Sequence, residues 1–262
     1  MSYEQIAHIV REALEMGTTS LVIDGGEPLT YAGVEHIPTL VDERAITTMF
    51  TSASTATREK LASLKRAGLY SLHVSLDSPV EEEHDAMRGR EGVFEEAERC
   101  VRWAREVGLL CDIYVVLSRD NVHHLQGFYE LAKQWGAHEL SFYEIVPTGR
   151  YMDTDRSLTP QDRKTLDEFM ARYERELSTE RDGVRVFSII GSMRELGCAA
   201  GRRWAHITPS GDVLPCACIP LPYGNVLREP LRAIWRRIRA DRAYRGAGEC
   251  LMRSPSFRAR LE

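Results

Sequence analysis

The sequence predicts an α/β protein: a barrel or partial barrel of the TIM type, followed by a small α+β module with a β-hairpin. Two observations support this fold class. As far as residue 146, short apolar strands alternate with amphipathic helices, which is the rhythm of βαβ units around a parallel sheet. From residue 184 the apolar period changes to two, which favours short strands and hairpins.

The first element is an amphipathic helix over residues 3–16, which Gly17 ends. Five strands follow, and a helix precedes each of the last three. We expect the strands at residues 20–24, 45–51, 70–78, 109–118 and 138–146, and the helices between them at 56–68, 93–108 and 121–136. In barrels of this kind, functional side chains lie at the C-terminal ends of the strands.

A turn-rich segment over residues 147–160 ends the repeating pattern. Thr159 and Pro160 begin a helix that we expect to run to about Leu177. A strand at 184–190, a hairpin at 203–216 turning at 209–212, and a helix at 230–240 come next. The predicted parts are therefore a barrel over 1–150, a connecting helix within 151–183 and a C-terminal module over 184–262.

Composition narrows the class of protein. The 262 residues carry a net charge of -5, which gives no overall attraction to nucleic acid. The N-terminal stretch lacks the basic start and unbroken apolar core of a signal peptide, and no apolar run is long enough to cross a membrane. We expect a cytoplasmic protein whose six cysteines are thiols or metal ligands. A basic run, Arg236, Arg237 and Arg239, is expected to be a solvated face, with a partner or an anionic substrate as the alternative.

The stretch VIDGGEPLT, residues 22–30, has the features of a ligand-binding loop. Gly25 and Gly26 follow a strand, and without Cβ atoms they let a ligand contact backbone N–H and C=O groups. Pro28 biases Glu27 toward an extended backbone, which fixes where its carboxylate points. Such a loop suits a ligand with an ammonium group, and a tight βα turn without a ligand is the alternative.

GGEPL after a strand resembles the motif with which the radical S-adenosylmethionine (radical SAM) family holds the methionine ammonium of its cofactor. VSLDS (74–78), EEHDAMRGREGVF (82–94), VLSRDN (116–121) and EIVPTGR (144–150) resemble later segments of that family in the expected order. The resemblance covers residues 1–150.

The resemblance assigns roles to individual residues. It implies that Gly25, Gly26, Glu27 and Pro28 bind the methionyl end of S-adenosylmethionine (SAM). Ser75 would contact the SAM sugar, and Arg88 would reach a carboxylate of SAM or of the substrate. For Arg88, anchoring its own glycine-containing loop is the alternative.

One feature of that family is missing. Its members place a CxxxCxxC loop after their first strand, where three thiolates hold the [4Fe–4S] cluster that binds SAM and delivers an electron. This sequence contains no CxxxCxxC, and its first element is already a helix. The resemblance thus implies a (β/α)6 barrel missing its first strand. We expect an N-terminally incomplete copy, with a member that has lost radical initiation as the alternative.

Four of the six cysteines, Cys198, Cys216, Cys218 and Cys250, fall in the last third of the chain. The predicted hairpin brings Cys198 and Cys216 to the same end, as Fe–S or zinc ligation requires; buried free cysteines are the alternative. CAAGRRWAHITPSGDVLPC and PYGNVLREPLRAIW resemble the auxiliary-cluster modules called SPASM and twitch. This resemblance implies one auxiliary [4Fe–4S] cluster on Cys198, Cys216 and Cys250, with Cys218 as candidate fourth ligand.

These resemblances imply a radical SAM oxidoreductase or maturase. A complete relative would cleave SAM to methionine and a 5′-deoxyadenosyl radical, which abstracts hydrogen from a peptide or a tetrapyrrole. A donor such as flavodoxin or ferredoxin would supply the electron, and the auxiliary cluster would pass electrons or bind substrate. Without the initiating motif, we expect this polypeptide not to cleave SAM. The alternative is a non-catalytic binding protein whose four cysteines hold Fe–S or zinc.

Overall fold

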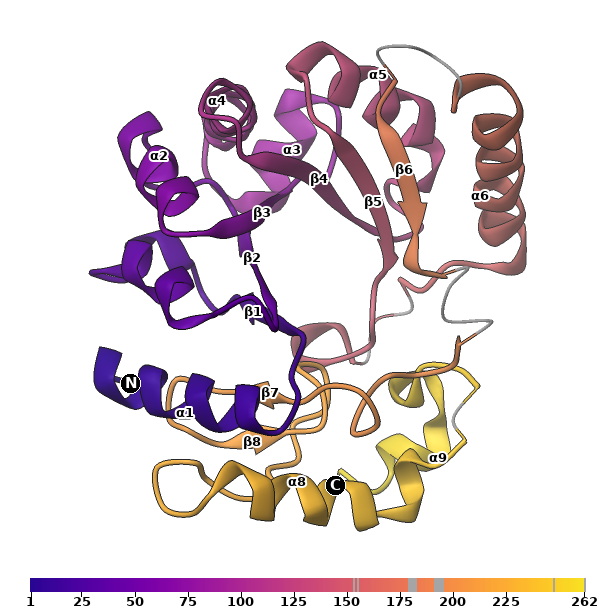
Figure 1. The fold of residues 1–262 in the computed structure, drawn as a ribbon. Coiled ribbons are helices and arrows are strands. Elements are labelled where there is room, and N and C mark those ends of the chain that lie inside the picture. Colours follow the sequence, from indigo (N-terminus) through magenta and orange to yellow (C-terminus); the bar gives the residue numbers. More distant parts are fainter. Residues whose placement is uncertain (153, 155, 179–182, 191–195, 247, 262) are drawn as a thin grey trace. The chain divides into compact units, whose positions relative to one another are not determined.

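The computed structural model describes residues 1–152, 154, 156–178, 183–190, 196–246 and 248–261 (Figure 1). These residues divide into two compact units. One, here the barrel unit, comprises Ser20–Ile145 and Ser157–Ile189. The other, here the cysteine unit, comprises Met1–Thr19, Val146–Arg156 and Ile190–Glu262.

A parallel sheet forms the centre of the barrel unit. Its described strands are six and stand in sequence order, each parallel to the next: β1 (Ser20–Ile23), β2 (Ile46–Thr51), β3 (Leu69–Ser75), β4 (Leu110–Leu117), β5 (Glu139–Glu144) and β6 (Arg185–Ser188). Parallel neighbours need crossover connections, which are mostly helical here. The predicted α/β fold with a partial barrel is confirmed.

Helices cover one face of this sheet (Figure 1). They are α2 (Arg58–Arg66), α3 (Glu81–Arg88), α4 (Val93–Glu106), α5 (Leu125–Trp135) and α6 (Pro160–Arg172). Short 3-10 turns occupy η1 (Pro28–Thr30), η2 (Val34–Leu40) and η3 (Val122–His124), and the π-helical turn η5 (Tyr173–Leu177) extends α6.

The two faces of the sheet differ in chemistry because side chains alternate along each strand. Apolar side chains such as Met49, Leu72 and Ile113 are fully buried on the face toward the helices. The opposite, inner face carries half-buried aromatic and polar groups, including Phe50 and His73. The inner face is therefore the more polar of the two faces of the sheet.

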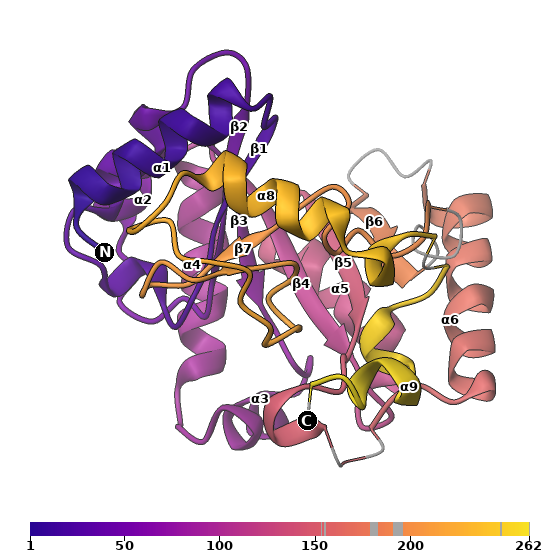
Figure 2. The same ribbon diagram turned by 90° about the horizontal axis from the view of Figure 1, so that it is seen from below.

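The cysteine unit gathers short elements around one apolar core. They are α1 (Tyr3–Glu15), η4 (Gly149–Tyr151), β7 (His206–Ile207), β8 (Val213–Leu214), α8 (Leu231–Ala240), η6 (Arg242–Tyr244), η7 (Leu251–Arg253) and α9 (Pro255–Arg258). The antiparallel pairing of β7 with β8 is the predicted hairpin. Figure 2 shows α1 beside the start of α8, where the Leu231 N–H donates to the Glu12 carboxylate at 2.8 Å.

Two elements differ from the prediction. The segment EEHDAMRG, expected as part of a loop, is mostly the helix α3, which ends at Gly89 with a positive φ of 70°. The strand expected in the C-terminal module is β6, which pairs with β5 in the main sheet. A period of two indicates a strand without naming its partner, and α6 is the crossover that makes this pairing parallel.

None of the helices in the described part of the chain combines the length and apolarity that a membrane span requires.

Candidate functional site

The glycine loop lies directly after β1, at the C-terminal edge of the sheet. Gly25 has a φ of 132°, a backbone conformation that other residues rarely adopt. A Cβ added at Gly25 or Gly26 would meet no atom within 4 Å, so the space beside this backbone is open. Glu27 has the extended backbone expected before Pro28, with φ -140° and ψ 106°. The backbone at Gly25 and Gly26 is therefore open on this side.

The Glu27 carboxylate ties this loop to the next strand. Its Oε1 accepts hydrogen bonds from the Leu29 N–H at 2.9 Å and the Thr51 hydroxyl at 2.7 Å. Its Oε2 accepts the Ser52 N–H at 2.7 Å and the Ser52 hydroxyl at 2.5 Å. Both carboxylate oxygens are thus occupied by described groups of the chain itself. Glu27 holds the loop in shape against the end of β2.

Ser75 and Arg88 lie along the same edge. Ser75 is the half-buried last residue of β3, and Val74 beside it pairs in register with Thr51. Arg88 ends α3, and its Nε lies 2.6 Å from an Asp77 carboxylate oxygen. This ion pair links Arg88 to the loop after β3. Contact of either residue with a ligand stays a prediction.

A polar chain on the inner face was not predicted. His73 Nδ1 lies 2.7 Å from the fully buried Asp112 carboxylate, and His73 Nε2 lies 3.1 Å from the Ser71 hydroxyl. The His73 ring stacks on Phe50 at 4.5 Å. Burial raises the pKa of Asp112, while the hydrogen bond and charge of His73 oppose the rise. Polar residues within otherwise apolar strands were the available signal, but the pairing depends on strand register.

The four late cysteines share the core of the cysteine unit. Cys198 is buried within it, and Cys216, Cys218 and Cys250 are half-buried against it. The other two, Cys100 and Cys111, are buried in α4 and β4 of the barrel unit. Burial raises the pKa of Cys100 to about 12, so it stays a thiol.

The four thiols are close enough to influence one another. The pKa of Cys216 is lowered to about 7, mainly because the Cys218 thiol donates a hydrogen bond to it; the Cys218 N–H and the Trp204 indole also donate, and burial opposes. The pKa of Cys218 is raised by that same bond, by burial and by the charges of the other three sulfurs. Among the described residues, no three or more His, Cys, Asp or Glu side chains form a ready single-ion site. Four gathered thiols are nonetheless the donor set that iron–sulfur ligation uses.

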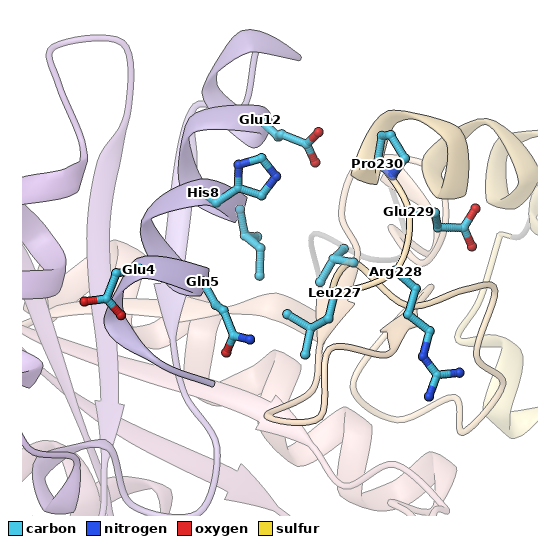
Figure 3. A pocket seen from close by; sticks show the side chains of 10 residues that line it. Glu4, Gln5, His8, Glu12, Leu227, Arg228, Glu229 and Pro230 are labelled. Carbon is cyan, nitrogen blue, oxygen red and sulfur yellow. The ribbon is translucent and has the colours of Figure 1, made fainter.

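A separate cavity of about 570 Å³ opens in the cysteine unit. Figure 3 shows side chains of α1, such as His8 and Glu12, on one wall and those of residues 227–230 on the other. Acidic, basic and apolar groups all line it, and none of the cysteines does.

Comparison with known proteins identifies the family of this chain. The model of the radical SAM superfamily matches residues 1–132. The chain belongs to the radical SAM superfamily. The SPASM model, described as an iron–sulfur cluster-binding domain, matches residues 198–257 of this radical SAM chain, which include the four late cysteines. The predicted family and its C-terminal module are thereby confirmed.

Related radical SAM proteins align over most of the chain. An AdoMet-dependent heme synthase of Methanosarcina barkeri is 25% identical, covering 95% of this chain and 77% of the relative. A PqqA peptide cyclase of Streptomyces rochei is 29% identical, covering 97% and 72%.

Solved structures share the fold. SuiB of Streptococcus suis, bound to precursor peptide SuiA, has a TM-score of 0.77 at 18% identity, covering 95% of this chain; the chain spans 65% of the SuiB length. Native anSMEcpe with bound AdoMet has a TM-score of 0.68 at 20% identity, covering 90% of this chain and 71% of that one.

Proposed function

We propose that this chain is a SAM-binding oxidoreductase of the maturase kind, acting on a peptide or a tetrapyrrole. The observation that carries the proposal is that one chain has both an open glycine loop at its parallel strand ends and four thiols in a second core. Relatives named as heme synthase and PqqA peptide cyclase support these two substrate classes. The superfamily match supports SAM as the cofactor.

At the glycine loop, the backbone and the side chains would have different roles in binding SAM. The methionyl ammonium of SAM would be met by backbone carbonyls beside Gly25 and Gly26, where space is open. Glu27, whose oxygens already accept two hydrogen bonds each, keeps those carbonyls in place. Ser75 would contact the sugar, and Arg88 would meet a carboxylate from its position beside Asp77.

In the cysteine unit, Cys198, Cys216, Cys218 and Cys250 would hold an auxiliary iron–sulfur cluster. Such a cluster supplies one-electron transfer when bound. The chain's own contribution is to gather the thiols and bury them partly in an apolar core. The Thr148 hydroxyl, which donates to the Cys218 carbonyl at 3.0 Å, helps to fix one of these ligands.

Calorimetric titration with SAM tests the barrel half of this proposal. The chain is expected to bind SAM, and Glu27→Ala is expected to weaken binding by about tenfold, because the loop loses an anchor of about 1.4 kcal/mol or more. Glu43→Ala, an exposed change in the same unit, is the matched control. Unchanged affinity in Glu27→Ala would remove the support for this loop.

Anaerobic reconstitution with iron and sulfide tests the cysteine half. Iron, acid-labile sulfide and visible absorbance are expected, and replacing Cys216 and Cys250 by Ser should abolish them. One zinc per chain would favour a non-catalytic metal-binding scaffold instead. Because the sequence has no CxxxCxxC, SAM and dithionite should give no 5′-deoxyadenosine with this polypeptide; its formation would contradict that expectation.

A further inference from the structure

The side chain of Lys60 on α2 connects the glycine loop to the turn that follows β2. Its ammonium donates to the Leu29 carbonyl at 2.8 Å and to the Thr55 carbonyl at 3.1 Å. The Thr55 hydroxyl donates to the same Leu29 carbonyl at 3.2 Å. Lys60 is half-buried, and salt screens a part-buried charge less than an exposed one. These three bonds tie the end of the glycine loop to the neighbouring strand end.

The turn after β2 has a strained backbone. Ala53 and Thr55 have φ values of 69° and 64°, in the left-handed region that residues with a Cβ rarely occupy. The Ala53 N–H donates to the Thr51 hydroxyl at 2.9 Å, and that hydroxyl donates to the Glu27 carboxylate at 2.7 Å. Strained backbone persists only where the surrounding contacts hold it, and it is concentrated at functional sites. The contacts that hold this turn are shared with the glycine loop.

The local rules for helices do not explain a lysine at position 60. Thr57 is the N-cap of α2 and accepts the Lys60 N–H at 3.2 Å, so Lys60 is the third helical residue. At this position the helix dipole favours an acid, and a capping box has Glu or Gln. Lys65 and Arg66 in the last turn follow the dipole rule, whereas Lys60 breaks it. Such exceptions to local rules are expected at functional sites.

We propose that Lys60 is a positioning residue for SAM. Its ammonium fixes the Leu29 carbonyl, so that the glycine loop before it keeps its backbone carbonyls in place for the methionyl ammonium. This inference rests on the proposed function, which assigns SAM to that loop. Glu27 holds the loop through its side chain, and Lys60 holds it through a backbone carbonyl two residues later. A loop that is already fixed loses less conformational entropy when the ligand binds.

Substitution of the lysine tests this role by calorimetric titration with SAM. Lys60→Met keeps a long apolar side chain without the ammonium, and Lys60→Arg keeps a cationic donor for the two carbonyls. Lys65→Met, an exposed change on the same helix, is the matched control. The dissociation constant should rise at least about tenfold in Lys60→Met, because charge-assisted hydrogen bonds are lost. It should stay within about threefold of the parent in Lys60→Arg and within about twofold in Lys65→Met.

A truncated ligand separates positioning from general support of the fold. 5′-Methylthioadenosine has the adenosine and the sulfur of SAM but lacks the ammonium and the carboxylate. Because the fixed carbonyls serve the ammonium, Lys60→Met should bind 5′-methylthioadenosine within about twofold of the parent. Circular dichroism reports whether each variant is folded. Equal weakening of both ligands in Lys60→Met would overturn the proposal, since the lysine would then support the whole site rather than the carbonyls.

Hydrogen exchange of the ligand-free chain separates this inference from the function beneath it. Amides of residues 24–31 should exchange faster in Lys60→Met than in the parent or in Lys65→Met. If the parent binds neither ligand, the SAM half of the proposed function fails, and the exchange rates still decide whether Lys60 holds the loop. If the parent binds SAM and Lys60→Met binds it equally well, the positioning role is wrong and the SAM site stands. If the parent binds SAM but not the truncated ligand, rescue by Lys60→Arg with faster exchange in Lys60→Met supports the role, and the failure of either contradicts it.

Discussion

At the scale of single residues, Glu27 anchors the glycine loop to the neighbouring strand. The motif resemblance implies that Glu27 binds the cofactor, and that role stays a prediction. In the structure its oxygens accept the N–H groups of Leu29 and Ser52 and the hydroxyls of Thr51 and Ser52. Those donors are part-buried, so they lose an acceptor that water replaces poorly if the carboxylate is removed.

Removing this carboxylate should therefore destabilise the fold. We expect Glu27→Ala to lower the free energy of unfolding by about 2–3 kcal/mol, because part-buried donors lose a charged acceptor. Glu43→Ala, at an exposed position, should change it by less than about 0.5 kcal/mol. Urea denaturation of the three proteins measures both values. A Glu27→Ala protein as stable as its parent would show that the anchor contributes little.

The His73–Asp112 pair supports a prediction of the same kind. Because Asp112 is fully buried, its carboxylate depends on His73 for compensation. Asp112→Ala should cost about 3 kcal/mol and Asp112→Asn less, since the amide still offers His73 an oxygen. A double-mutant cycle with His73→Ala measures the coupling, expected at about 1–3 kcal/mol. Additive losses would mean that the two side chains act independently.

Individual site residues could be predicted only where the pattern that identifies them is local in the sequence. Gly25, Glu27 and the late cysteines could be recognised because their neighbours in the chain form motifs. Thr51, which anchors Glu27, and Asp112, which holds His73, act through side chains far away in sequence. Such pairs depend on strand register, which the pattern of one strand does not contain.

At the scale of elements, the helices and strands with strong periodicity were predicted, and the exceptions have physical causes. α3 is short, and the residue at its N-cap is Val80, whose side chain makes no cap hydrogen bond, so the usual start signal is missing. The acidic residues 81–83 in its first turn favour a helix through its dipole, and Gly89 ends it. Those charges and that glycine were the available evidence for a helix.

The start of α6 supports a prediction about pH. Thr159 and Asp162 form a reciprocal capping box, and hydrogen bonds from the Thr159 N–H and hydroxyl lower the pKa of Asp162. A lowered carboxyl pKa stabilises the fold above the unfolded value, and this stabilisation is lost as pH falls through the lowered pKa. Asp162→Ala should cost about 1 kcal/mol at pH 7. The difference in the free energy of unfolding between Asp162→Ala and the parent should stay constant down to about pH 5. It should become smaller below about pH 3.9.

Urea midpoints across this pH series give the measurement. Lys164→Ala, an exposed change on the same helix, serves as the control and should show no such narrowing. A difference that grows as the solution becomes acidic would contradict the assigned direction of the pKa shift.

At the scale of the whole molecule, α1 packs with residues from the other end of the chain, and the order of elements in the sequence does not reveal these contacts. Residues 1–19 belong to the same compact unit as residues 190–262. Glu12 accepts the Leu231 N–H, Glu15 accepts the Arg232 guanidinium through its carbonyl, and the Met1 amine donates to the Pro209 carbonyl. Each contact joins residues more than 200 positions apart. The periodicity of α1 predicted its buried face but not the element against which it packs.

The four late cysteines lie in only one of the two units, so the two units should respond differently to metal. A cluster that binds the folded cysteine unit and not the unfolded chain stabilises that unit by mass action. Hydrogen exchange followed by mass spectrometry should therefore show slower exchange in peptides from residues 196–246 after anaerobic reconstitution, while peptides from β2 to β5 stay unchanged. The variant with Cys216→Ser and Cys250→Ser should lose this protection, and Cys100→Ser, in the barrel unit, should keep it. Equal protection of both units, or protection that survives loss of the two late cysteines, would show that the metal binds elsewhere.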